Sequence, residues 1–279
     1  MHLFIEPFAA NGFMANALEA GILVAIACGI VGTLTVLRGL AFIGDALAHG
    51  VLPGIAVSIL LGYPGILGAA VGSVVMIGGI GSITRRSKLS NDTAIGLFFV
   101  GMLALGVVIV SRSSSFSGDL VRILFGELLG TSRADILVQL AVTGALALAA
   151  FAFRRPFLLL CFSPEQAQVS GFPPRLYHLV MLGMIALTVV VSFQTVGTML
   201  VFGMLLAPAA TAALFARRMG TMMATASGVG AAAVYLGLLA SYHLGLAAGA
   251  SIALVATAMF FVAFSVSRVA RRRPAGASG

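Results

Sequence analysis

The sequence predicts an all-α polytopic membrane protein with about nine transmembrane helices. Hydrophobic residues make up 60% of the chain and charged residues only 9%, whereas a soluble domain is about 45–50% apolar and roughly 25% charged. The 279 residues also divide into nine apolar stretches, each near the ~20 residues that cross a bilayer as a helix. This composition excludes a soluble cytosolic enzyme, a disordered chain and a nucleic-acid-binding domain.

Each apolar stretch is a continuous run, without the alternation that the strands of a membrane barrel show, so each is expected to be a helix. In chain order the stretches cover residues 16–37, 40–61, 63–84, 93–111, 135–153, 176–193, 197–216, 221–241 and 245–266. The sixth and seventh almost touch, and the count falls to eight if one of these stretches does not cross. Many of the 34 glycines stand in small-xxx-small spacing, which lets helix backbones approach closely in lipid.

Basic residues follow every second span and predict the topology. Only three of the 16 lie elsewhere, in the link after the fourth span, where acidic residues balance them. These three are Arg112, Arg122 and Arg133. Because cytoplasmic loops are enriched in Arg and Lys, the N-terminus is expected outside and the C-terminus inside. We therefore predict an external segment over residues 1–15, a single transmembrane domain over 16–266 and a basic cytoplasmic tail over 267–279.

Ionisable side chains within the apolar stretches are the candidates for function, because a charge inside a membrane is costly. Glu19 lies near the start of the first span, at an expected interfacial position. Asp45 and His49 lie inside the second span at i, i+4 spacing, which places both on one helix face. A carboxylate and an imidazole can ligate one divalent cation. The pair could also be a hydrogen bond that joins helices, or part of a proton relay.

Proline and glycine surround this pair and predict an interrupted helix. Pro53 lacks the backbone N–H that would bond to the carbonyl of His49, and Gly50 and Gly54 flank the same turn. Interrupted helices expose carbonyl oxygens and recur at the ion sites of transporters.

A polar segment over residues 163–171 is the second candidate feature, on the predicted cytoplasmic side. Ser163 is a suitable N-cap, Pro164 a suitable first helical residue, and Glu165 favours the positive end of the helix dipole. Gly171 is a natural stop. The segment is expected to be a helix of one to two turns outside the membrane, either a docking helix for a cytoplasmic partner or a simple connecting turn.

Enzymatic motifs are missing from the sequence. It has no Gly-x4-Gly-Lys-Ser/Thr loop for ATP hydrolysis and no His-Glu-x2-His metalloprotease motif. Ser227 and Gly228 only weakly resemble a serine hydrolase motif, and Cys28 and Cys161 stand too far apart in sequence to indicate a disulfide framework. We therefore expect that this chain does not itself hydrolyse ATP, that it is a transport protein rather than an enzyme, and that it has no intrinsic cofactor; an intramembrane enzyme is the weaker alternative.

Residues 36–54, VLRGLAFIGDALAHGVLPG, resemble the signature of the ABC-3 family, the membrane permease subunits of bacterial ABC importers for zinc, manganese or iron. Residues 163–171 resemble that family's coupling helix, residues 189–212 resemble the segment that follows it, and residues 124–129 match a weaker motif. One departure is Ser163, where the family often has aspartate, although serine can also cap a helix.

This resemblance implies a homodimer of the type II importer architecture in the bacterial cytoplasmic membrane. It also implies a separate ATP-hydrolysing subunit and an extracellular or periplasmic metal-binding protein. Asp45 and His49 would contact the passing metal, and Ser163, Glu165, Ala167 and Gly171 would belong to the coupling helix. Two other hypotheses stay open from the residues alone, a proton-coupled secondary transporter of metal or solute and an intramembrane enzyme.

Overall fold

The computed structural model describes residues 7–8, 11–87, 89–111, 126 and 128–272. Several residues used in the sequence predictions lie outside this part of the chain: residues 1–6 and 9–10 of the N-terminal segment, Lys88, residues 112–125 with Arg112 and Arg122, Glu127, and residues 273–279 of the tail.

Within the described part, nine helical segments are long and apolar enough to cross a membrane, which confirms the predicted fold class. The helices are α2 (Gly12–Leu37), α3 (Ala41–Gly50), α4 (Leu52–Leu60), α5 (Gly65–Arg86), α6 (Asn91–Val110), α8 (Arg133–Ala152), α9 (Arg154–Phe162), α10 (Pro164–Val169), α11 (Pro174–Ala213), α12 (Met219–Leu244) and α13 (Ala248–Arg272), with a short 3-10 turn over Leu128–Gly130. Together α3 and α4 form one span, and α11 contains two.

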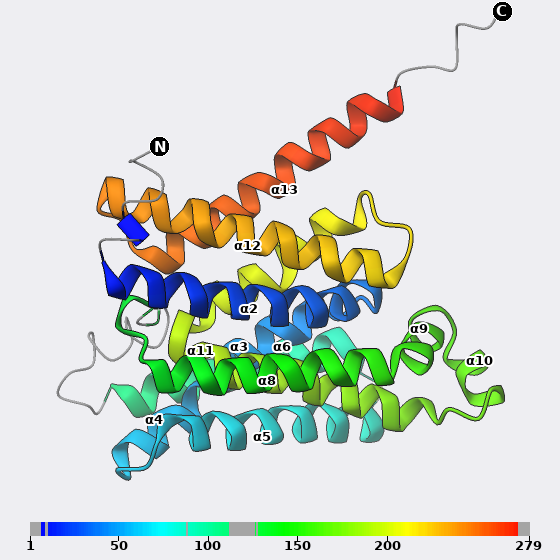
Figure 1. The fold of residues 1–279 in the computed structure, drawn as a ribbon. Helices are drawn as coiled ribbons and strands as arrows, with labels where there is room; N and C mark the ends of the chain where they lie inside the picture. The colour runs from blue at the N-terminus through cyan, green and yellow to red at the C-terminus, as the bar shows by residue number, and fades with distance from the viewer. Residues whose placement is uncertain (1–6, 9–10, 88, 112–125, 127, 273–279) are drawn as a thin grey trace, which may run out of the picture.

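Helix α2 lies at the centre of the bundle, with α11 and α12 packed against it (Figure 1). Glycines make this packing close. A Cβ at Gly32 would overlap the carbonyl group of Leu205 on α11, and one at Gly29 would lie 2.6 Å from the backbone nitrogen of Ser227 on α12. Because lipid supplies no hydrophobic force between helices, such backbone contact is a main source of their association.

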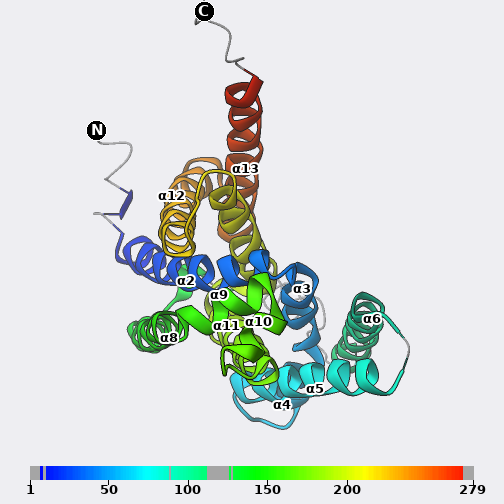
Figure 2. The same cartoon turned by 90° about the vertical axis from the view of Figure 1, so that its right-hand side faces the viewer.

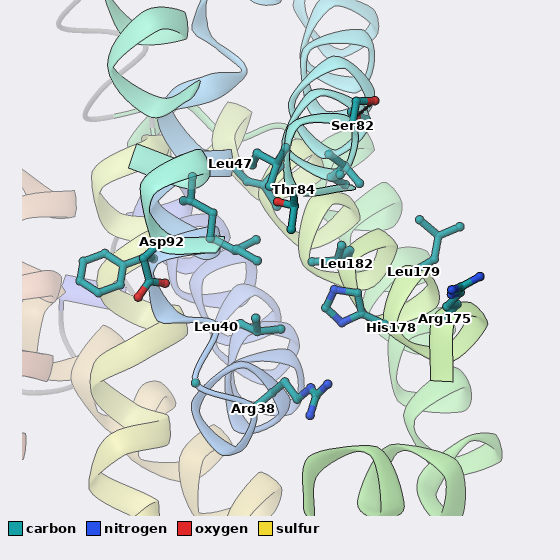
Figure 3. Close-up of a pocket in the computed structure, with 18 of the residues that line it drawn as sticks. Arg38, Leu40, Leu47, Ser82, Thr84, Asp92, Arg175, His178, Leu179 and Leu182 are labelled. Atoms are coloured by element: carbon teal, nitrogen blue, oxygen red, sulfur yellow. Dashed lines mark hydrogen bonds between the residues drawn. The ribbon is translucent and has the colours of Figure 1, made fainter. Parts of the chain in front are cut away.

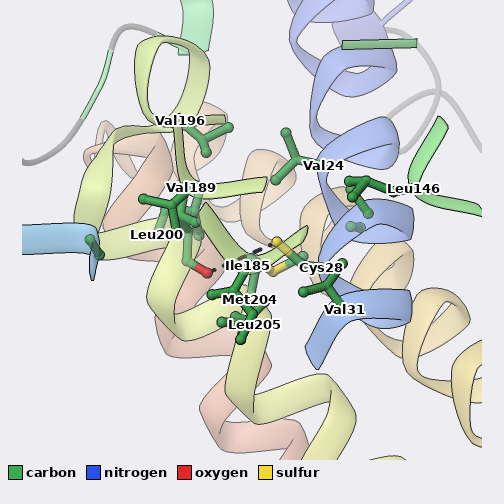
Figure 4. Packing of buried hydrophobic residues seen from close by; sticks show 14 of the residues in the cluster. Val24, Cys28, Val31, Leu146, Ile185, Val189, Val196, Leu200, Met204 and Leu205 are labelled. Carbon is green, nitrogen blue, oxygen red and sulfur yellow. Dashed lines mark hydrogen bonds between the residues drawn. The ribbon is translucent and has the colours of Figure 1, made fainter. Parts of the chain in front are cut away.

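Helix α11 reverses direction at Gly197. This residue has φ 76° and ψ 162°, a backbone conformation that is essentially restricted to glycine. Consequently Val189, before the turn, and Leu200, after it, lie side by side in the core that surrounds Cys28 of α2 (Figure 4). The backbone of Gly126, from the weaker of the family-like motifs, lies directly against Val196 and Gly197. The sixth and seventh predicted spans are therefore two helices with a one-residue turn.

The helix ends form two groups. The C-terminal ends of α2, α5, α8 and α13, together with α9 and α10, lie at the same end of the bundle (Figure 1). The arginines of the described residues that follow alternate spans therefore gather there, as the charge pattern predicts, and we call this the arginine end. At the opposite end, Arg133 begins α8 and forms an ion pair with Glu19 of α2, with 2.7 Å between Nη1 and Oε2.

Helices α6, α8 and α13 lie at the periphery (Figure 2). They carry many exposed large apolar side chains, including Leu97, Leu148 and Leu254. An outward apolar surface is what a helix in contact with lipid presents, because lipid tails are as apolar as these side chains.

Candidate metal and docking sites

Asp45 and His49 lie on α3, one turn apart, shortly before the helix is interrupted. The Nε2 atom of His49 is 3.6 Å from Oδ1 of Asp45, and the side chains are 11% and 30% exposed. A distance of 3.6 Å is within ion-pair range but too long for a hydrogen bond, so no hydrogen bond joins the two side chains. One cation with ligand distances of about 2.1 Å and tetrahedral geometry would place its nitrogen and oxygen ligands about 3.4 Å apart. The pair therefore has the spacing to share one divalent cation.

Phe99 of α6 orients the imidazole of His49. The ring centroids are 5.7 Å apart and the planes make an angle of 68°, an edge-to-face contact. The Nδ1 atom of His49 is buried and has no hydrogen-bond partner among the described residues. Sequence reasoning did not identify Phe99, since it stands in an apolar run that gives no sign of contact with α3.

The interruption between α3 and α4 is built by the predicted proline and glycines. Helix α3 ends at Gly50, α4 begins at Leu52, and Pro53 occupies the first turn of α4. A Cβ at Gly54 would overlap the carbonyl group of Gly68 on α5. The contact between these glycines holds α4 against α5 and thereby fixes the point at which the span breaks, directly after His49.

Two ligands from one chain do not make a closed metal site. No group of three or more His, Cys, Asp or Glu residues that could hold a metal ion occurs in the described part of the chain. Structural zinc sites normally supply four protein ligands. The Asp45–His49 pair is thus suited to brief contact with a passing ion.

The polar segment at the arginine end contains the short helix that the sequence predicts. Helix α10 spans Pro164–Val169, and the Ser163 hydroxyl accepts a hydrogen bond of 3.3 Å from the backbone N–H of Gln166. Glu165 lies in the first turn, and Gly171 has φ 82°. The structure shows how these residues build the helix, and its role is treated below as a proposal.

Two apolar side chains of α10, those of Ala167 and Val169, differ in exposure. Ala167 is only 1% exposed and turns toward its own chain, so it cannot offer a contact surface directly. Val169, by contrast, is 90% exposed. Val169 is therefore the apolar side chain that α10 exposes most, and sequence reasoning did not identify it because Val169 was considered only as part of the segment.

Arg38 connects this region to the helix that carries Asp45 and His49. It lies in the turn between α2 and α3, and its Nη1 donates a hydrogen bond of 2.7 Å to the carbonyl oxygen of Leu160 on α9. That oxygen belongs to the last turn of α9, where carbonyl groups have no partner within the helix. The sequence indicated Arg38 only as a topology signal, since its partner is far away along the chain.

Comparison with known proteins identifies the family of the chain. The model of a family described as "ABC 3 transport family" matches residues 10–267. This chain belongs to that family. It is therefore a multi-pass membrane transport permease and not itself an enzyme, as the motif resemblance implied.

Relatives and a solved structure agree over nearly the whole length. The chain is 38% identical to the "Manganese transport system membrane protein MntC" of Listeria innocua, covering 94% of this chain and 93% of that protein. It is 36% identical to the "Chelated iron transport system membrane protein YfeD" of Yersinia pestis, covering 96% and 89%. Its fold matches "PsaBC from Streptococcus pneumoniae in complex with Fab" with a TM-score of 0.86 and 37% identity, covering 94% of both chains.

Proposed function

We propose that this protein is the membrane permease of a binding-protein-dependent ABC importer for a divalent metal ion. Relatives are named for manganese or iron transport, and the sequence resemblance adds zinc as a possible substrate. In this proposal two copies of the chain form the pathway in a bacterial cytoplasmic membrane. An external metal-binding protein delivers the ion, and a separate subunit hydrolyses ATP.

The single observation that carries the proposal is the Asp45–His49 pair. It lies in a buried, charge-poor span, next to a helix interruption, with 3.6 Å between Nε2 and Oδ1. A charged aspartate at the centre of a membrane helix costs about 2.5–3.5 kcal/mol even by the mild insertion scales, so a carboxylate within such a span needs a partner or a role. A divalent cation supplies the charge that both ligands prefer.

Uptake of radiolabelled manganese into proteoliposomes that hold the permease with its ATPase and binding protein tests this role. We expect Asp45→Asn and His49→Ala each to lower uptake at least tenfold while the complex still assembles. Glu19→Gln is the matched control, because it removes a half-exposed carboxylate that pairs with Arg133 at the other end of the bundle, and it should leave uptake near wild type. Near wild-type rates in both pair variants would reduce the pair to a helix contact.

The same assay separates the metals and the energy sources. Unlabelled ferrous iron or zinc that competes at equal concentration identifies the preferred ion. Dependence on ATP and loss with an ATPase inhibitor are expected. Uptake that continues without the ATPase subunit and collapses with a protonophore would instead identify the proton-coupled alternative.

We further propose that α10 is the docking helix for the ATPase subunit, with Ser163 as its cap, Glu165 in its first turn and Gly171 at its end. Because Ala167 packs inward, the contact is assigned to the exposed face that includes Val169. Val169→Asp should abolish the stimulation of ATPase activity by metal-loaded binding protein, and Val169→Ile should preserve it. Equal stimulation in the two variants would contradict docking at this face.

The proposed orientation follows the arginine distribution. Residues 1–15 would lie outside, residues 16–266 would form the transmembrane domain, and the basic tail over 267–279 would lie in the cytoplasm beside α9 and α10. The arginine end is then the cytoplasmic end, which is the side where an ATP-hydrolysing subunit must bind.

A further inference from the structure

A cavity of about 870 Å³ opens at the arginine end, and its lining includes neither Asp45 nor His49. Its walls come from the turn before α3, from α3 itself, the end of α5, the start of α6 and the start of α11 (Figure 3). Neither the transport mechanism proposed above nor the docking helix uses this space.

The cavity is polar at its mouth and apolar at its base. On α5, Thr84 lies two residues from the helix end, whereas Ile77 lies about 10 Å deeper at 1.5 Å per residue. On α11, Arg175 lies in the first turn, and Leu182 lies about 10 Å further in. The space therefore matches a molecule with a polar head and an apolar body.

Buried polar atoms at the mouth lack partners. The Oγ1 of Thr84 and the Nδ1 of His178 are buried without a hydrogen bond to any described residue. Figure 3 shows His178 directed into the space between Thr84 and Arg38. The bond from Arg38 to Leu160 uses one of the five N–H donors of a guanidinium, so donors remain for an anion. A buried polar group without a partner is costly, and a bound headgroup would satisfy these atoms.

The charges at the mouth favour a phosphate over a metal ion. Arg38 and Arg175 line the cavity, and the one acidic residue among its lining residues is Asp92 on the α6 wall. Two guanidinium groups repel a cation, and the described residues contain no cluster of three metal ligands. Free phosphate would leave the apolar base unused, whereas the acyl chains of a lipid would fill it.

We propose that this cavity binds an anionic phospholipid, with its phosphate at Arg38 and Arg175 and an acyl chain against Ile77 and Leu182. Basic pockets between helices at the cytoplasmic side of a membrane recognise anionic headgroups in this way. The proposal rests on the cavity and on the proposed cytoplasmic position of the arginine end, and failure of the metal proposal would not affect it.

The protein contains no tryptophan, so one introduced indole reports on its own surroundings. Ile80→Trp places the probe in the cavity wall, and Leu148→Trp places a control on the outer face of α8, where Leu148 is 69% exposed. Each full-length variant is reconstituted in phosphatidylcholine that contains a fixed fraction of either brominated phosphatidylglycerol or brominated phosphatidylcholine. The quenching of tryptophan fluorescence by the two brominated lipids is then compared.

We expect brominated phosphatidylglycerol to quench Ile80→Trp several-fold more effectively than brominated phosphatidylcholine, with equal quenching of Leu148→Trp. Arg175→Gln in the Ile80→Trp background should lower that preference about fivefold, the usual contribution of one basic residue near a membrane surface. Arg217→Gln is the matched control, because Arg217 is exposed at the same end and does not line the cavity.

Equal quenching of Ile80→Trp by both lipids would overturn the proposal, and so would an equal loss of preference with Arg217→Gln. An emission change with inorganic phosphate, without quenching by either brominated lipid, would identify a free-anion site and also overturn it. Native mass spectrometry of the wild-type chain and the two arginine variants gives a second measurement that does not require the introduced tryptophan. Retained phosphatidylglycerol should decrease only with Arg175→Gln.

Discussion

Two glycines of α5 offer a matched test of the packing that holds the metal-bearing span. Gly68 lies against the backbone of Gly54 on α4, where an added Cβ would overlap the carbonyl group, and it also approaches the Ser58 hydroxyl. Gly78, in the same helix, has no atom within 4 Å of an added Cβ. Substitution by alanine makes the same chemical change at both positions, so only the surroundings differ.

The expected magnitudes follow from these surroundings. Gly78→Ala should raise the free energy of unfolding by up to about 1 kcal/mol, because alanine has the higher helix propensity. Gly68→Ala gains the same propensity but forces two backbones apart, and overpacking typically costs about 1–3 kcal/mol. A backbone carbonyl cannot rotate away as a side chain can. The two variants should therefore differ in Tm by roughly 2–12 °C, at about 2–4 °C per kcal/mol for a protein of this size.

Thermal unfolding of the purified full-length variants in one detergent, followed by circular dichroism at 222 nm, measures this difference. The Tm of Gly68→Ala should fall below that of wild type, and the Tm of Gly78→Ala should match or exceed it. Equal Tm values for the two alanine variants would refute the inference that α4 and α5 meet at Gly54 and Gly68. Metal uptake should follow the same order, because the contact positions the break beside His49.

Three further outcomes are expected. Glu19→Gln should change the free energy of unfolding by less than about 1 kcal/mol in urea titrations, because its 2.7 Å ion pair with Arg133 is solvent-exposed; a larger loss would show that the pair is shielded from water. A reporter enzyme fused to the C-terminus should be active only in the cytoplasm, and external activity would reverse the proposed orientation. Burial raises the pKa of the Cys161 thiol on α9, with a smaller opposing effect of Arg38. The rate at which maleimide labels Cys161 should therefore keep rising at pH values where the labelling rate of an exposed Ser170→Cys has already levelled off. Identical pH profiles for the two thiols would contradict this.

The spans were predictable because each depends on local composition. A continuous apolar run near 20 residues has few alternatives in lipid, and the predicted stretch over residues 93–111 differs by only one residue at each end from the structural span Asp92–Val110. The shared face of Asp45 and His49 was equally accessible, because i, i+4 spacing fixes their proximity once the helix is assigned.

Contacts between distant segments were not predictable. The bond between Arg38 and Leu160 joins residues 122 positions apart, and the contact between His49 and Phe99 requires α6 to lie on α3. Nothing in either local sequence indicates these partners. The inward direction of Ala167 likewise depends on how α10 packs against its own chain, which a six-residue helix does not determine by itself.

The turn at Gly197 also has a consequence for how the chain enters the membrane during synthesis. As a straight helix, the 40 residues of α11 would extend about 60 Å, roughly twice the hydrocarbon thickness of a bilayer. No polar loop separates the two halves, so they must be delivered to the lipid as one hairpin. A residue with a side chain at position 197 would oppose the reversal and favour a single crossing. Every segment after it, α12 and α13 included, would then be inserted with inverted orientation.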